Sequence, residues 1–554
     1  MKWSAGPSVR ALAATVVIVA LAGPVPQAVA QQAESPSATH PAAHQSNLPT
    51  PESVLGFPVG TDFKLATYEQ SIAYFKALAA ASDRLELLDV GTTSFGRTWY
   101  LAVISSPDNL AKLEYFRAIA QRLAHPEGLT DDSAHALARE GRAFVDISGG
   151  LHASEVAGAQ HTIALAYDLL SRADEPAVKE ILDNDVLFLW PSLNPDGQDI
   201  VVKWYRENVG TPYEAAPLYT LWEKYVGHDN NRDAYMLNTI ESRVITRTWR
   251  HWEPQIIHVH HQSSPFPTRI WLPPFSEPVS PDVNPLMARE VNTIGMTMAQ
   301  ELESHGQPGA TSMGLAFDAW YPGYVDYLPM LKNTVAYWTE TAGYRYATPY
   351  FYTLRDFPQN MRDLRARSLY SSPWKGGWWR LKDAVDYMMT ASEAALEYAA
   401  KYRAEILYNK YQAGRDAIAE FKAQPPYAYV VPQKQRDPMA AVALLKRLAF
   451  NGIRVDQLSK PVAMDGMTYP AGTWVIPMDQ EFAELSKAVL VVQHYPDLRQ
   501  YPEGPPAQPY DAAGWTLGYQ LGVQVVTVHS PLSDSVQAAM HPVHGQPVDW
   551  HTAK

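Results

Sequence analysis

A histidine and a glutamate three residues apart, His152 and Glu155, follow the apolar stretch 143–148 and the pair Gly149 and Gly150. This pattern predicts a buried strand, a turn and the start of a helix. Side chains three apart at a helix start share one face, so an imidazole nitrogen and a carboxylate oxygen would converge. Zn²⁺ accepts such donors, and a catalytic zinc has three protein ligands and one open position. The spacing alone also fits a capped helix with a surface histidine, so the decision rests on the rest of the chain.

Four further polar clusters occur later in the chain, each near the end of an expected strand. They are 194–197 (Asn-Pro-Asp-Gly), 229–233 (Asp-Asn-Asn-Arg-Asp), 258–262 (His-Val-His-His-Gln) and 339–342 (Thr-Glu-Thr-Ala). Open α/β sheets bind their ligands outside the carboxyl ends of the strands. The clusters therefore predict one polar site assembled from distant segments.

The elements that must position these clusters alternate between strand and helix. An unbroken apolar strand is expected at 186–190 and further strands at 255–261 and 334–340, with a helix over 156–171. Such strands between helices indicate a sheet covered on both faces. We predict an α/β fold with a mixed, largely parallel sheet and helices on both faces over residues 55–422. A separate strand and helix rhythm predicts a smaller C-terminal α/β domain over residues 423–554.

The N-terminus has the three parts of an export signal. Lys2 and Arg10 precede an apolar run over residues 11–23, and Ala28-Val-Ala30 offers a cleavage site. These features predict a signal peptide over residues 1–30, because a membrane anchor needs closer to about 20 apolar residues. Residues 31–54, rich in Ser, Ala, Pro, Gln and His, are expected to be a disordered linker. The mature protein is then secreted or periplasmic, without stable membrane insertion.

The composition excludes several classes of protein. In 554 residues, 46% are hydrophobic and 11% aromatic, which is ample for packed cores. The formal net charge of −13 argues against nucleic acid or an anionic membrane as the partner. The chain has no cysteine, which rules out disulfides and a thiol nucleophile and leaves any metal to His, Glu and Asp. A serine hydrolase is disfavoured, since no Gly-x-Ser-x-Gly elbow is present.

The clusters, taken in order, resemble the zinc carboxypeptidase family, the carboxypeptidase A-like metallopeptidases. His-x-x-Glu, Asn-Pro-Asp-Gly, Asp-x-Asn-Arg, a histidine closing a strand and a strand with one glutamate follow one another over roughly residues 57–404. The chain looks most like a bacterial branch with a C-terminal α/β domain. The resemblance implies a carboxypeptidase-like fold and one zinc ion per chain. It also implies hydrolysis of C-terminal peptide bonds in peptides or proteins through a zinc-bound water.

The resemblance further implies the metal ligands. His152 and Glu155 match the first two, and the third comes from the cluster at 258–262. A strand directs His258 and His260 to one face and His261 to the other. In the similar branch the ligand is followed directly by Gln, as His261 is here. We choose His261, with His260 as the alternative.

Further site residues come from the same resemblance. Glu340 corresponds to the general base and acid, and a lone glutamate in an apolar strand is costly to bury without a purpose. Asn231 and Arg232 match the pair that holds the terminal carboxylate of the substrate, for which a planar guanidinium is suited. Asp229 corresponds to the carboxylate that orients the first histidine ligand. Arg206 is the candidate for stabilising the oxyanion.

Tyr321 and Tyr324 both fit the tyrosine that covers the substrate, and we choose Tyr324. Two alternatives to a metallocarboxypeptidase remain. One is a zinc deacylase or amidase acting on N-acyl amino acids or cell-wall peptides. The other is a non-catalytic peptide-binding protein on the same fold. Asn231 and Arg232 beside Glu340 favour the peptidase. The C-terminal domain is expected to restrict substrates or to dock.

Overall fold

The largest sheet of the computed structural model has the strand order β1-β2-β4-β3-β5-β10-β6-β8. The structure describes residues 48–263, 267–314, 317–343 and 345–543. In sheet order, the strands span Leu85–Thr92, Thr98–Ile104, Asp185–Leu189, Ala143–Gly149, Ile256–Ser263, Val335–Ala342, Ile270–Trp271 and Ala310–Thr311. β4, β3, β5 and β10 are parallel neighbours, whereas β1, β2 and β6 join antiparallel partners. The predicted mixed, largely parallel sheet is confirmed.

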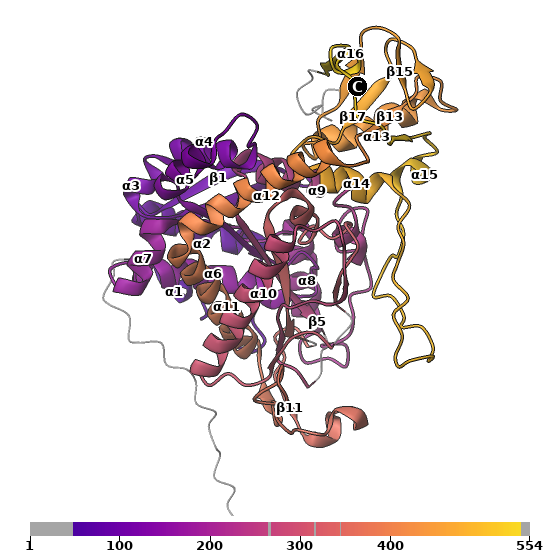
Figure 1. Ribbon diagram of the computed structural model, residues 1–554. Helices are drawn as coiled ribbons and strands as arrows, with labels where there is room; N and C mark the ends of the chain where they lie inside the picture. The colour runs from indigo at the N-terminus through magenta and orange to yellow at the C-terminus, as the bar shows by residue number, and fades with distance from the viewer. Residues whose placement is uncertain (1–47, 264–266, 315–316, 344, 544–554) are drawn as a thin grey trace, which may run out of the picture. The chain divides into compact units, whose positions relative to one another are not determined.

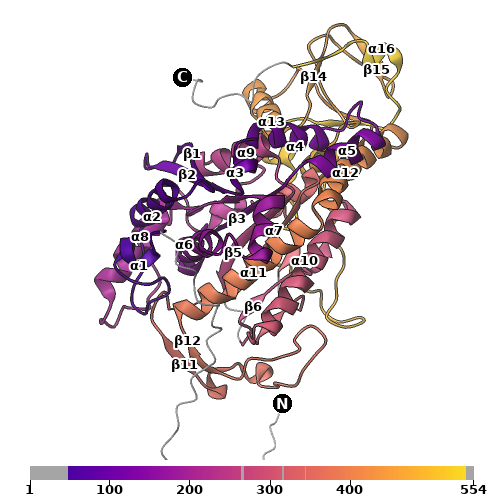
Figure 2. The same ribbon diagram turned by 90° about the vertical axis from the view of Figure 1, so that its left-hand side faces the viewer.

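Helices cover both faces of this sheet, as predicted. The helices of this part are α2 (Tyr68–Ala81), α4 (Leu113–Ala124), α5 (Asp131–Glu140), α6 (Val156–Ser171), α7 (Pro176–Asn184), α8 (Pro195–Asn208), α9 (Ile240–Trp252), α10 (Pro285–Ser304), α11 (Leu381–Lys401) and α12 (Arg403–Ala423). α6, α10 and α11 lie across one face (Figure 2). On this face His260 Nε2 of β5 is 2.8 Å from Ser392 Oγ of α11. α9 covers the other face, where Trp252 packs against Phe144 and Phe188.

A second sheet, antiparallel throughout, follows in the chain. Its order is β18-β13-β17-β14-β19, spanning Val526–Val528, Ala428–Val431, Trp474–Pro477, Asp456–Leu458 and Met540–Pro542. The helices here are α13 (Pro438–Phe450), α14 (Ala483–Leu490), α15 (Leu517–Leu521) and α16 (Asp534–Gln537) (Figure 1). Residues 42–554 form one compact unit. The domain boundary between residues 422 and 423 stays a prediction, and it falls in the last turn of α12.

Short elements complete the described chain. They are α1 (Pro51–Leu55), α3 (Pro107–Leu110), η1 (His228–Arg232), η2 (Leu328–Lys332), η3 (Leu354–Asp356), η4 (Gln359–Met361) and the paired strands β7 (Ser276–Val279) with β9 (Asp318–Ala319), β11 (Tyr350–Tyr352) with β12 (Gly377–Trp379), and β15 (Val462–Met464) with β16 (Met467–Tyr469).

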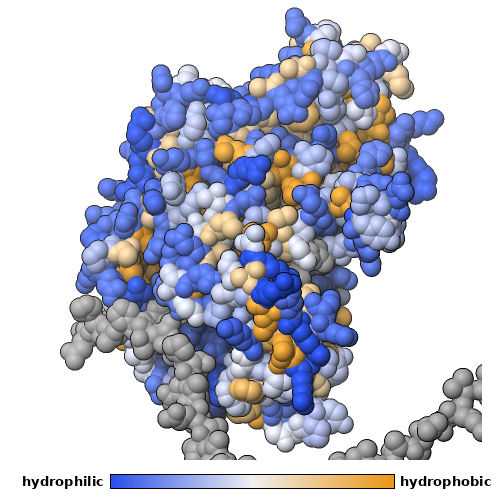
Figure 3. Space-filling view, turned by 60° about the horizontal axis from the view of Figure 1, so that its bottom comes forward, coloured by the Kyte–Doolittle hydropathy of each residue, from blue (hydrophilic) through white to orange (hydrophobic). Residues whose placement is uncertain are grey.

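The linker predicted over residues 31–54 extends too far. Helix α1 begins at Pro51, because Thr50 accepts a hydrogen bond from Ser53 N and a proline fits the first helical position. The rest of this linker up to residue 47, and the predicted signal peptide, lie outside the described residues. None of the helices in the described part of the chain is both long and apolar enough to cross a membrane. On the face viewed in Figure 3, hydrophilic residues dominate and hydrophobic residues form separate groups.

The turn between β3 and α6 depends on two glycines in close contact. A Cβ added to Gly149 would lie 2.6 Å from the Cα of Gly158 in α6. Gly150 has φ +74°, a conformation that glycine adopts without strain. The end of β3 and the first turn of α6 therefore touch through their backbones. This close approach holds the intervening turn, residues 151–155, against the edge of the sheet.

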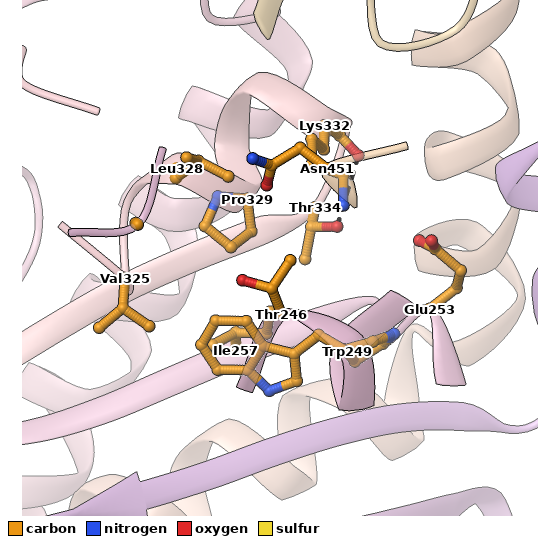
Figure 4. Close-up of a pocket in the computed structure, with 12 residues that line it drawn as sticks. Thr246, Trp249, Glu253, Ile257, Val325, Leu328, Pro329, Lys332, Thr334 and Asn451 are labelled. Atoms are coloured by element: carbon orange, nitrogen blue, oxygen red, sulfur yellow. Dashed lines mark hydrogen bonds between the residues drawn. The ribbon is translucent and has the colours of Figure 1, made fainter. Parts of the chain in front are cut away.

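A buried ion pair joins the amino ends of β5 and β10 to α12. The ammonium group of Lys410 donates to Glu253 Oε2 at 3.0 Å, to Pro254 O at 2.9 Å and to Thr334 Oγ1 at 3.0 Å. Glu253 and Pro254 precede β5, and Thr334 precedes β10. Burial raises the pKa of Glu253, but Lys410 and Lys332 outweigh it and hold that pKa at about 2. Figure 4 shows Glu253, Lys332 and Thr334 around a cavity between α9, η2 and the start of β10.

Removing the cation of this pair should destabilise the protein. Lys410→Met leaves Glu253 buried without its ammonium partner, so we expect the free energy of unfolding to fall by about 3–5 kcal/mol. Denaturant unfolding followed by tryptophan fluorescence measures this change. The matched double variant Lys410→Met/Glu253→Gln removes both charges and should recover much of the loss. If the single variant is as stable as the double variant, the pair does not hold the strand ends.

Candidate metal centre

His152, Glu155 and His261 converge on one point at the carboxyl edge of the large sheet. Their ligand atoms all lie within 4.8 Å of one another. His152 Nδ1 is 2.8 Å from Glu155 Oε1, and His261 Nδ1 is 2.9 Å from Glu155 Oε2. The two Nδ1 atoms are 3.1 Å apart. The structure therefore brings together the three residues that the sequence predicted as ligands.

A tight turn directs the first two of these side chains inward. Glu155 N donates to His152 O at 2.9 Å, and α6 starts only after Glu155. The prediction that the pair shares a helix face is wrong, since both residues lie in the turn that precedes α6. Asn194 and Asn230 both donate to the carbonyl of Leu151, at 3.1 and 2.7 Å. These two amides fix the backbone just before the first ligand.

The alternation of β5 directs His261 toward the other two converging side chains. His261 Nε2 is 2.8 Å from Asp326 Oδ2, and both side chains are buried. A histidine whose second nitrogen binds a carboxylate is held in the ring orientation that a metal needs. His260 points to the other face, where Ser392 Oγ is 2.8 Å from its Nε2 and Thr339 Oγ1 is 3.0 Å from its Nδ1. The structure does not bring the alternative ligand His260 to the site.

Asp229 does not orient His152, contrary to the prediction. It lies in η1 with its side chain exposed, and the residue before it, His228, stacks on the His152 ring at 4.0 Å. Within the described residues, His152 Nε2 is buried without a hydrogen-bond partner. The carboxylate that binds one of the two converging histidines is Asp326, and its partner is His261. Sequence analysis missed it, although an acid inside the aromatic stretch 320–327 was a signal.

Glu340 lies beside His261 because β10 and β5 are parallel neighbours in register. The register pairs Glu340 with His261 directly. Glu340 is buried, with 6% of its surface exposed, and it lines the same cavity as the three converging side chains. Burial raises the pKa of Glu340 to about 8, with His261 opposing the rise and Glu155 adding to it. An acid of this kind next to a metal centre is suited to proton transfer.

Arg232 and Asn231 reach the same cavity from η1. Arg232 Nε donates to Asp511 Oδ2 at 2.7 Å, and its Nη1 donates to Asn231 O at 2.7 Å. The amide of Asn231 accepts from Val325 N at 2.7 Å and donates to Asp326 at 3.3 Å. Asn231 thus fixes the wall around Asp326, and its role toward a substrate carboxylate stays a prediction. Sequence analysis did not anticipate Asp511.

Tyr324 lines the cavity, and Tyr321 does not. The guanidinium of Arg232 lies 4.5 Å from the centre of the Tyr324 ring. Arg206 is not near the cavity, so the prediction that it stabilises an oxyanion is wrong. Its Nη2 donates to Leu65 O at 2.7 Å and to Gln70 at 2.8 Å, because α8 directs it toward the N-terminal segment.

The cavity combines a donor set with acidic, basic and aromatic walls. Its lining consists of His152, Glu155, His228, Asn231, Arg232, His261, Ser263, Phe317, Tyr324, Asp326, Trp338, Glu340 and Tyr510. Two imidazole nitrogens and a carboxylate are the ligand types of a catalytic zinc with an open position. The two imidazoles hold the pKa of Glu155 below its usual range, although burial opposes them. The residues present therefore fit zinc.

Comparison with known proteins agrees with this donor set. Residues 71–266 match the family model described as zinc carboxypeptidase. The matched segment contains all three converging residues and Arg232, and it ends before Glu340. This match confirms the predicted resemblance and zinc as the cofactor of the site. No curated protein matches the chain.

The chain is also similar to solved structures. A protein of Shewanella denitrificans OS-217 described as a carboxypeptidase A is 15% identical, with 61% of this chain and 70% of that chain covered and a TM-score of 0.40. A metallo-carboxypeptidase of Pseudomonas aeruginosa is 14% identical, with 62% and 70% covered and a TM-score of 0.37. The carboxypeptidase A of Helicoverpa armigera is 15% identical, with 63% and 74% covered and a TM-score of 0.35.

The two histidines at the end of β5 allow a matched test of the metal site. The purified protein should contain one zinc ion per chain. His261→Ala should lose most of it, because a catalytic zinc site has three protein ligands. His260→Ala should keep its zinc, since His260 points away from the site. Metal analysis by mass spectrometry, with thermal unfolding as a check on folding, measures both. Equal zinc content in the two variants would contradict the assignment of His261.

Proposed function

We propose that this chain, which carries a zinc carboxypeptidase domain, removes single residues from the C-termini of peptides or proteins. The observation that supports this proposal is one cavity that holds the donor set, Glu340 and Arg232 together. A metal centre alone would serve many hydrolases. A guanidinium in the same cavity adds a group suited to a terminal carboxylate.

Each side chain has a distinct task in this proposal. Zinc at the donor set supplies a Lewis acid that polarises the scissile carbonyl and lowers the pKa of a water. Glu340 accepts the proton of the attacking water on its carboxylate and passes it to the leaving amine nitrogen. Asp326 holds His261 in its ligand orientation through Nε2. Tyr324 and Tyr510 wall the cavity beside Arg232.

The proposal also places the protein outside the cytoplasm, as a secreted or periplasmic enzyme. This part rests on the sequence pattern of residues 1–30, with its basic residues, apolar run and Ala-x-Ala site. Measurement of the N-terminus of the protein after expression in a bacterial host tests it. A mature chain that begins near residue 31 and is recovered from the periplasm or medium is the expected result.

The substrate end can be tested with paired peptides that differ only in a free or amidated C-terminus. If Arg232 binds the carboxylate, amidation should lower kcat/KM by the equivalent of about 2–5 kcal/mol of transition-state binding. Arg232→Lys should lose most of the preference for a free C-terminus, because an ammonium group cannot form the planar two-point contact with a carboxylate. Release of the terminal residue measured by mass spectrometry gives both rates. Equal cleavage of acid and amide peptides would instead indicate an amidase or an endopeptidase.

Replacing Glu340 separates chemistry from binding. Glu340→Gln keeps the shape and removes the base, so kcat should fall roughly 10²–10⁴-fold. Zinc content and the Kd for peptide should change little, because the ligands and Arg232 are intact. Glu86→Gln, on the exposed side of β1, serves as the matched control and should keep full activity. Loss of zinc in Glu340→Gln would identify Glu340 as a ligand, and unchanged kcat would place the base elsewhere.

A further inference from the structure

The segment between α14 and α15, residues 491–516, contributes two side chains to the cavity region although it belongs to the C-terminal part of the chain. In Figure 1 it is the long yellow loop that leaves α14 and returns to α15. Tyr510 lines the cavity, with its ring centre 5.5 Å from Phe317 and 6.1 Å from Tyr324. Asp511 forms the ion pair with Arg232. Both residues lie outside residues 71–266, the segment that matches the family model.

The segment is anchored firmly where it reaches the cavity. Trp515 is buried, donating from Nε1 to Ala488 O at 2.8 Å and from its backbone N to Gln493 Oε1 at 2.7 Å. Trp320 Nε1 donates to Ala513 O at 3.3 Å. The Trp515 ring centre lies 5.9 Å from Trp320. These contacts fix the backbone that follows Asp511.

Both oxygens of the Asp511 carboxylate are already in use. Oδ1 accepts from Ala512 N at 2.7 Å, and Oδ2 accepts from Arg232 Nε at 2.7 Å. A carboxylate held in this way orients its partner, and it is not a free group that swings through the cavity. Hydrogen bonds in which both partners are ionised are short and strong.

The contacts of Arg232 leave one edge of its guanidinium free. Nε binds Asp511, Nη1 binds Asn231 O, and the plane of the group packs on Tyr324 at 4.5 Å. Among the described residues, Nη2 has no hydrogen-bond partner. A free arginine side chain loses considerable rotamer entropy when a ligand immobilises it. Here the protein has already restricted that freedom, which favours binding through preorganisation.

We propose that Asp511 is a positioning residue of the catalytic site, which holds the guanidinium of Arg232 so that its Nη2 edge receives the terminal carboxylate of the substrate. This inference rests on the proposed function. It gives the C-terminal part of the chain a role in substrate binding. The hydrogen bond is the essential feature, because the negative charge of Asp511 by itself would repel an incoming carboxylate.

Two substitutions at residue 511 separate the hydrogen bond from the charge. Asp511→Ala removes both, and KM for a peptide with a free C-terminus should rise about 10- to 100-fold, the range for a lost hydrogen bond to a charged group. Asp511→Asn keeps an oxygen acceptor for Arg232 Nε without the charge, so KM should stay unchanged or fall. In both variants kcat should change little, since the metal ligands and Glu340 are untouched. Asp497→Ala removes an exposed acid of the same segment and should match the wild type.

Binding of an N-acetylated amino acid and of its amide, measured by calorimetry, provides a readout independent of turnover. Asp511→Ala should weaken binding of the acid and leave binding of the amide unchanged. Equal KM and Kd in Asp511→Ala and the wild type would overturn the proposal, as would tighter binding in both variants, which would make Asp511 a competitor of the substrate. If the wild type cleaves acid and amide peptides equally, the proposed function fails, while a Kd for the acid that depends on Asp511 still supports this inference.

Discussion

The register of three parallel strands is the constraint on which the site depends. β3, β5 and β10 lie side by side, with Gly149 paired to His260 and His261 paired to Glu340. Because parallel strands end at the same edge, residues separated by more than a hundred positions in the chain meet there. The ion pair of Lys410 and Glu253 holds the opposite ends of β5 and β10. Hydrogen bonds between neighbouring strands therefore set the relative positions of the side chains in the site.

The alternation within β5 decides which histidine faces the cavity. His261 points to the cavity, whereas His258 and His260 point into the packed layer beneath α6 and α11. There, hydroxyl groups of Ser392 and Thr339 bind the two nitrogens of His260, and Thr339 Oγ1 is also 3.2 Å from His258 Nε2. Burial keeps the pKa values of both histidines below their usual range. A shift of one residue in register would exchange the two environments. Residue type alone thus cannot identify the ligand in this cluster.

Features encoded by local patterns were predictable from the sequence, and features that depend on loops were not. The strand ends follow from apolar runs, and the three converging residues follow from short motifs and the family resemblance that these motifs carry. Arg206 was misplaced because its direction depends on how α8 rotates against the N-terminal segment. Asp229 was misplaced because η1 directs it outward. Asp326 and Asp511 act across 65 and 279 positions of the chain, and no spacing rule connects them to His261 or Arg232.

The balance of charge explains why distant loops converge on this cavity. Glu155, Asp326 and Glu340 are all buried around two imidazoles, an arrangement that costs free energy unless positive charge balances it. A divalent cation held by His152, Glu155 and His261 would supply that charge. Arg232 has a different counter-ion, Asp511, which follows the cavity-lining Tyr510 in the chain. The two positive centres would therefore be neutralised by separate acids, so that Asp511 serves the guanidinium while Glu155 serves the donor set.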